Sequence, residues 1–252
     1  MIPSGSISTV IENSIATITF SHPASNSFPS TLLQQLMNEL NKVDKNPEVA
    51  IIVLKSKGNN AFCAGASFDE LLSLTTLDEG TKFFSGFANV INAMRNCSKL
   101  IVGRIQGKAV GGGVGLAAAC DYTFATQNSM VKLSEIAVGI GPFVIEPAVS
   151  RKMGKMAFAE MTLNPTEWKS ANWAKENHLF SEVFQSLDEL DIRLNEFTSE
   201  LSSYNSTALF EMKKVFWEGT ENWDQLLYER AAISGMLVLS DHAKQALQKF
   251  KK

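Results

Sequence analysis

The chain of 252 residues is long enough for one large domain or two small ones. Its hydrophobic fraction of 45% and formal net charge of −3 are typical of an ordinary soluble globular protein, and it lacks the basic stripe expected of a nucleic-acid-binding protein. The longest apolar stretch, residues 109–120, is too short and too rich in glycine to span a membrane.

The cysteine pattern and the N-terminal residues allow an expectation about the cellular compartment. Cys63, Cys97 and Cys120 are odd in number, widely spaced and without a metal-ligand pattern, so we expect reduced thiols and no metal site. The N-terminal residues lack a basic region followed by an apolar core, so no signal peptide is predicted. A cytoplasmic protein is the simplest expectation.

Apolar periodicity predicts an alternation of strands and helices over the first two thirds of the chain. A β-hairpin opens it, with Asn13-Ser14 as the turn, and Ser30 is expected to cap the first helix. Strands are predicted at 7–12, 15–20, 50–54, 100–105, 122–125 and 130–133, and helices at 30–44, 68–74, 78–96, 143–153, 155–162 and 166–176.

After residue 187 only helices are predicted, at 187–204, 206–217, 223–239 and 241–250. Their apolar positions exceed the needs of one small bundle, which favours an assembly face; helices that simply cap the α/β core are an open alternative. We therefore expect a core at 1–190 and a helical assembly region at 191–252.

Residues 111–113 are three consecutive glycines between the predicted strand 100–105 and a small-residue stretch that predicts a helix. Glycine costs backbone entropy, so such a run indicates that something approaches the backbone closely. N–H groups at a helix start carry the positive end of the dipole and can hold an oxygen that gains negative charge. Close helix packing is an equally open explanation.

Gly113, Gly115 and Ala118 also match the spacing of a dinucleotide-binding fingerprint, with Glu135 downstream. The fingerprint requires an immediate turn from strand to glycine, whereas residues 106–110 intervene here. Glu135 also lies beyond the tip of the following strand. We reject this interpretation.

A second loop of small residues, Ala64-Gly65-Ala66, precedes another predicted helix. If the two loops converge, one N–H from each can hold a single oxygen as an oxyanion hole. Glu135 is a lone carboxylate in an apolar segment, where burial would raise its pKa and suit it to proton transfer. A surface charge at a helix N-terminus is the alternative for Glu135.

In combination and in order, these features resemble the crotonase family, the enoyl-CoA hydratase/isomerase superfamily. The resemblance covers nearly the whole chain. It implies an α/β fold, a spiral of ββα units followed by C-terminal helices that form trimers, often paired into hexamers. It implies a coenzyme A thioester as substrate, with coenzyme A part of the substrate and no separate cofactor. The matching segments are 62–66, 105–113, Cys120-Asp121, Ser134-Glu135, Gly139 and Pro142.

The resemblance also implies roles for individual residues. The oxyanion-hole N–H groups would belong to Ala66 and Gly112, and Glu135 falls on the second of the family's two catalytic glutamates. The implied substrate-binding residues are Ala24, Ala64, Ala66, Ser67, Phe68, Asp69, Gly112 and Gly115.

The chain departs from the family pattern where the first catalytic glutamate is expected, because Gly115 stands there. Ser67 and Asp69 replace the family's usual acid and lysine after the Gly-Ala pair. Hydration of a double bond uses two carboxylates in the standard enzyme, whereas isomerisation can proceed with one. The carboxylate count therefore favours an isomerase.

Residues 114–115, 133–135 and 143–147 instead resemble a bacterial subgroup assigned to hydration of branched substrates such as methylglutaconyl-CoA. We give this likeness slightly more weight and expect an enoyl-CoA hydratase-type enzyme. A single-glutamate isomerase and an acyl-CoA-binding protein without turnover remain the alternatives.

Overall fold

The computed structural model describes residues 5–250 of the chain. A six-stranded sheet forms its centre, in the spatial order β1-β2-β3-β5-β7-β9. The hairpin pair is antiparallel and every other neighbouring pair is parallel. Its strands are β1 (Ser6–Glu12), β2 (Ile15–Ser21), β3 (Ile51–Ser56), β5 (Leu100–Ile105), β7 (Tyr122–Thr126) and β9 (Glu182–Phe184).

A second, smaller sheet has three short parallel strands in the order β4-β6-β8. They are β4 (Ala61–Cys63), β6 (Lys108–Val110) and β8 (Val131–Lys132). Parallel strands end at the same edge of a sheet. The segments that follow the three strands, which begin at residues 64, 111 and 133, are therefore brought together at one edge.

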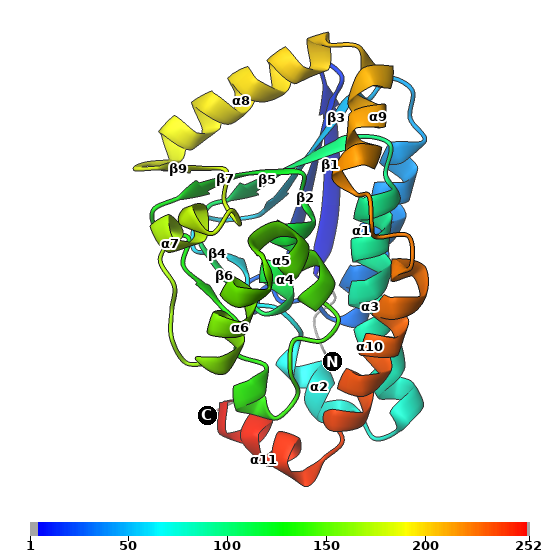
Figure 1. Ribbon diagram of the computed structural model, residues 1–252, viewed down its shortest axis with the longest axis vertical. Coiled ribbons are helices and arrows are strands. Elements are labelled where there is room, and N and C mark those ends of the chain that lie inside the picture. The colour runs from blue at the N-terminus through cyan, green and yellow to red at the C-terminus, as the bar shows by residue number, and fades with distance from the viewer. Residues whose placement is uncertain (1–4, 251–252) are drawn as a thin grey trace.

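Helices cover the two sheets (Figure 1). The first seven are α1 (Ser30–Asp44), α2 (Phe68–Ser73), α3 (Leu77–Asn96), α4 (Gly112–Ala119), α5 (Glu146–Met153), α6 (Lys155–Leu163) and α7 (Ala171–Glu176), with a 3-10 turn η1 (Ile136–Val138) before α5. The last four are α8 (Leu187–Ser203), α9 (Ser206–Phe216), α10 (Trp223–Leu237) and α11 (Asp241–Phe250).

The C-terminal helices pack on the rest of the molecule rather than forming a separate bundle. Helix α8 lies across one face of the large sheet, where Leu190 and Leu194 join a buried cluster with Val53 and Phe124. Helix α10 runs beside α3, and α11 contacts η1 and α2 at the opposite end of the molecule from α8 (Figure 1). The predicted boundary between residues 190 and 191 falls inside α8, and the two-part division stays a prediction.

The mixed α/β architecture with a parallel sheet confirms the predicted fold class. Three local predictions are wrong. Pro29 rather than Ser30 is the N-cap of α1, and the helix expected at 143–153 begins only at Glu146, after a turn. The helix expected from residue 166 begins at Ala171, because Lys169 pairs in extended form with Val131 through two 2.9 Å backbone hydrogen bonds.

The three cysteines are free and buried, as expected of reduced thiols. Burial raises the pKa of each thiol to about 12, so none is a ready nucleophile. Among residues 5–250, no helix is both long and apolar enough to cross a membrane.

Candidate active site

The segments after β4, β6 and β8 meet in one apolar pocket. It is lined by Ala64, Gly65 and Ala66 from the first, by Gly111 and Gly112 from the second, and by Ser134 and Glu135 from the third. The first two segments touch. A methyl group on Gly65 would lie 2.8 Å from the Val110 carbonyl oxygen and 3.4 Å from the Gly112 nitrogen.

The backbone N–H groups of Ala66 and Gly112 are suited to hold one oxygen. The backbone N–H of Phe28 donates to the Gly65 carbonyl, and the Phe28 carbonyl accepts the N–H of Ser67. These two hydrogen bonds engage the residues on either side of Ala66, so the N–H of Ala66 itself points away from Phe28. Gly112 is the first residue of α4, where the N–H lacks a partner within the helix. Within the described part of the chain, neither N–H donates a hydrogen bond between elements.

Glu135 reaches the same pocket from the end of β8, as the residue before the η1 turn. Its Oε1 lies so close to Gly111 that a Cβ there would come within 2.6 Å of it. Gly111 also has a φ of 53°, a conformation that glycine adopts without strain. This glycine is therefore required both by the backbone turn and by the approach of the carboxylate.

Glu135 is half-buried, and one of its carboxylate oxygens is held away from water. Oε2 is buried and has no hydrogen-bond partner among the described residues. Desolvation disfavours the charged form and raises the pKa of Glu135 to about 7, while backbone N–H groups of Glu135 and Ser134 act in the opposite direction. A carboxyl group with this pKa can both accept and return a proton near neutral pH.

Apolar side chains complete the pocket. Phe84 and Phe87 come from α3, Leu71 from α2, and Phe143 and Ile145 from the turn before α5. None of these residues was predicted to belong to the site. Apolar periodicity predicts the helices that carry Leu71, Phe84 and Phe87, but it cannot separate pocket walls from core.

Glu135 is the one carboxylate that lines this pocket within residues 5–250. Gly115 lies in α4, buried and outside the lining. A Cβ on Gly115 would overlap Cγ2 of Ile145 and lie 2.7 Å from its Cβ. The space that a longer residue 115 would need is therefore filled by Ile145.

The other predicted site residues divide into two groups. Ala64, Ala66, Phe68, Gly112 and Glu135 line the pocket together. Four residues do not line it: Ala24, Ser67, Asp69 and Gly115.

Three of those four have clear local positions. Ala24 is exposed in the turn whose Ser25 carbonyl accepts the N–H of Ala64 at 3.1 Å. Ser67 is the buried N-cap of α2, where its hydroxyl accepts the Glu70 N–H at 3.4 Å, and Asp69 is exposed in the first turn of that helix. No group of three or more His, Cys, Asp or Glu in the described part of the chain is arranged to hold a metal.

The chain is similar to proteins of one family throughout its length. The family model for enoyl-CoA hydratase/isomerase matches residues 10–252. The peroxisomal Delta(3,5)-Delta(2,4)-dienoyl-CoA isomerase of Arabidopsis thaliana is 26% identical over 82% of this chain and 79% of its own. The short-chain-enoyl-CoA hydratase of Clostridium acetobutylicum is 29% identical over 52% of this chain and 50% of its own.

A third relative and two crystal structures extend the comparison. The human mitochondrial 3-hydroxyisobutyryl-CoA hydrolase is 30% identical over 47% of this chain, and the chain spans only 31% of it. An enoyl-CoA hydratase structure from Bacillus halodurans superposes with a TM-score of 0.89 at 21% identity, covering 96% of this chain and 99% of its own. One from Mycobacterium avium gives 0.86 at 24% identity, with 97% and 95% covered. The chain belongs to the enoyl-CoA hydratase/isomerase family, the crotonases.

Proposed function

We propose that the protein moves the double bond of an unsaturated acyl-CoA thioester by proton transfer. Glu135 is the single acid/base, and the N–H groups of Ala66 and Gly112 hold the thioester oxygen. Membership of the family and the names of its relatives support an acyl-CoA substrate. The Glu135 carboxylate, whose buried Oε2 has no hydrogen-bond partner among the described residues, lies beside two backbone donors, and this observation carries the proposal.

The reaction balances with this one carboxylate. Glu135 removes a proton from Cα, and the C–H electron pair enters an enolate whose oxygen accepts hydrogen bonds from the two N–H groups. If the substrate carries its double bond between Cβ and Cγ, the enolate extends to Cγ. The same carboxyl group then returns the proton to Cγ, and the double bond comes to lie between Cα and Cβ. No atom is gained or lost.

The pocket composition favours this reaction over hydration. Addition of water requires a group that activates the water as well as a proton for Cα, and Glu135 is the one carboxylate among the described lining residues. Ile145 fills the space beside Gly115, and the surrounding walls are apolar. Such walls leave a water molecule few polar groups to bind.

Hydration is the second candidate. It is favoured by the likeness of residues 133–135 and 143–147 to the hydratase-type subgroup and by the Clostridium relative, which is named a hydratase. In that reaction Glu135 would both activate the water and deliver the proton to Cα. Binding of acyl-CoA without turnover is the third reading.

A panel of enoyl-CoA thioesters incubated in deuterated water and analysed by mass spectrometry separates these reactions. Isomerisation shifts the double bond without adding the mass of a water, and deuterium enters only as far as the Glu135 proton exchanges with solvent, whereas hydration adds that mass. The Glu135→Gln variant should lose at least about 100-fold in rate with little change in thioester affinity. Glu146→Gln is the matched control, because the Glu146 carboxylate accepts a 2.8 Å hydrogen bond from the Ser150 hydroxyl and does not line the pocket. Unchanged turnover in Glu135→Gln would contradict the mechanism.

A further inference from the structure

A second cleft, of about 650 Å³, lies away from the active site. It is formed where the C-terminal end of α5, the segment after α7, the start of β7 and the end of α9 meet. The N-terminal ends of α4 and α5 adjoin the active-site pocket, whereas this cleft lies at their C-terminal ends. The eight residues of α4 place the two roughly 12 Å apart along the helix axis.

The cleft is lined by an excess of cations. Arg151, Lys152 and Lys175 line it, and Asp121 is the single acid among its described lining residues. Asp121 is already engaged, because its Oδ2 pairs with the buried Lys213 ammonium at 3.1 Å and its Oδ1 accepts the Trp217 indole N–H at 2.8 Å. Within residues 5–250, no acid forms an ion pair with Arg151, Lys152 or Lys175.

Arg151 is fixed in place with donor capacity to spare. Its guanidinium stacks on the Trp217 ring at 3.7 Å, and one terminal nitrogen donates to the Phe216 carbonyl at 2.9 Å. Its Nε is buried and has no hydrogen-bond partner in the described structure. The second terminal nitrogen donates no hydrogen bond within the described residues, so it is this nitrogen that is available to an anion in the cleft.

Lys152 connects the cleft to α4. Its ammonium donates to the Cys120 and Asp121 carbonyls at 2.7 and 3.1 Å, at the C-terminal end of the helix whose first N–H belongs to Gly112. Burial and the nearby Arg151 charge lower the pKa of Lys152 to about 8, against the opposite effect of Cys120 and Asp121. A negative charge in the cleft would favour the ammonium form of Lys152.

We propose that this cleft binds the phosphate group of a small molecule through Arg151, Lys152 and Lys175. A guanidinium fork beside two ammonium groups matches the charge and the several acceptor oxygens of a phosphate. Tyr122, Phe180 and Phe216 form apolar walls next to these cations, which suits an organic phosphate. The site is separate from the thioester pocket and does not depend on its chemistry.

Calorimetric titration of the whole protein with inorganic phosphate and with phenyl phosphate, at constant ionic strength, tests the proposal. Saturable binding of both is expected, and tighter binding of phenyl phosphate identifies an organic phosphate as the ligand. Lys175 is exposed, so Lys175→Gln should fold normally and weaken binding about tenfold. Arg151→Lys keeps the charge but loses the fork, and it should weaken binding as well.

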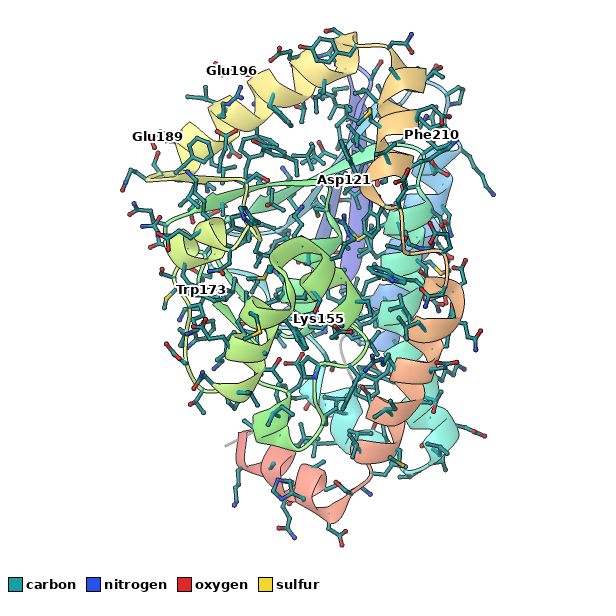
Figure 2. The ribbon with its side chains drawn as sticks, viewed as in Figure 1. Asp121, Lys155, Trp173, Glu189, Glu196 and Phe210 are labelled. Atoms are coloured by element: carbon teal, nitrogen blue, oxygen red, sulfur yellow. The ribbon has the colours of Figure 1, made fainter. Side chains whose placement is uncertain are left out.

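Lys155→Gln is the control, because Lys155, at the start of α6 (Figure 2), is an exposed lysine outside the cleft lining. It should leave phosphate binding unchanged, and turnover of Lys175→Gln without phosphate should match that of the wild type. Absence of saturable binding would overturn the proposal. So would a loss in Lys155→Gln equal to that in Lys175→Gln, since general charge screening would then explain the effect.

Discussion

At the scale of single residues, the account depends on the environment of Glu135. A carboxyl group with a pKa of about 7 is half ionised near neutral pH, because its surroundings offer too little polar contact to the charged form. The sequence could indicate this residue, since Glu135 stands alone in an apolar segment. The sequence could not show whether Glu135 is a buried acid/base or a surface charge at a helix N-terminus, because both alternatives have the same local pattern.

Because the pKa of Glu135 is raised, the free energy of unfolding should depend on pH. The folded state holds the Glu135 proton up to about pH 7, whereas the unfolded chain releases it near the ordinary value of 4.5. The folded state therefore binds more protons between these values, and stability falls as the pH rises through this window. Relative to Glu135→Gln, the wild type should lose on the order of 3 kcal/mol of unfolding free energy from pH 4.5 to 8. Denaturant titrations at both pH values check this, and a pH-independent difference would contradict the burial.

A second prediction concerns the Gly112 N–H. Any Cβ at position 112 would overlap the Phe87 ring, so a comparison with glycine alone would mix packing with catalysis. Gly112→Ala and Gly112→Pro, both made with Phe87→Leu, differ chiefly in the N–H, because proline is tolerated at the first position of a helix. The proline variant should be about 100- to 1,000-fold slower than the alanine variant. Equal rates in two folded variants would exclude this N–H from the oxyanion hole.

At the scale of elements, the small sheet determines where the site forms. Strands β4, β6 and β8 have only two or three residues each. The strand at β8 was predicted, whereas β4 and β6 were not, because three residues are too few to show a period-two pattern. The two small-residue loops could be identified from sequence, but their convergence depends on β4 and β6.

The packing of α4 against the turn before α5 allows a further prediction. Gly115→Glu should destabilise the fold by about 1–3 kcal/mol and should not restore hydration of crotonyl-CoA, because its Cβ overlaps Ile145. Ile145→Gly removes both nearest atoms, and glycine is acceptable at this N-cap position of α5. The double variant should recover stability relative to Gly115→Glu alone. Thermal unfolding measures this, and a double variant no more stable than the single one would contradict the packing.

At the scale of the whole molecule, the apolar faces of the C-terminal helices remain uncovered in the single chain. Met212 and Val215 of α9 are 47% and 50% exposed. The helices of this region were predictable because their apolar periodicity is long and regular. Their close association with the sheet was not predictable, because an apolar helix face can pack equally well within the same chain or against another subunit.

We propose that these faces form subunit contacts in a trimer or a dimer of trimers, within residues 195–250. Light scattering at micromolar concentration should give a trimeric or hexameric mass. Met212→Ser with Val215→Ser should lower that mass. Met156→Ser, an 81% exposed position on α6 outside the predicted assembly region 191–252, should leave it unchanged. A monomeric wild type would contradict the assembly.

The most direct test of the central claim follows one hydrogen through the reaction. A 3-enoyl-CoA carrying deuterium at Cα is given to the wild-type enzyme in ordinary water, and the product is analysed by mass spectrometry and NMR. If Glu135 alone carries the proton, part of the deuterium should appear at Cγ of a 2-enoyl-CoA product, and Glu135→Gln should abolish the transfer. Failure to form any 2-enoyl-CoA product, or transfer that persists in Glu135→Gln, would contradict the account.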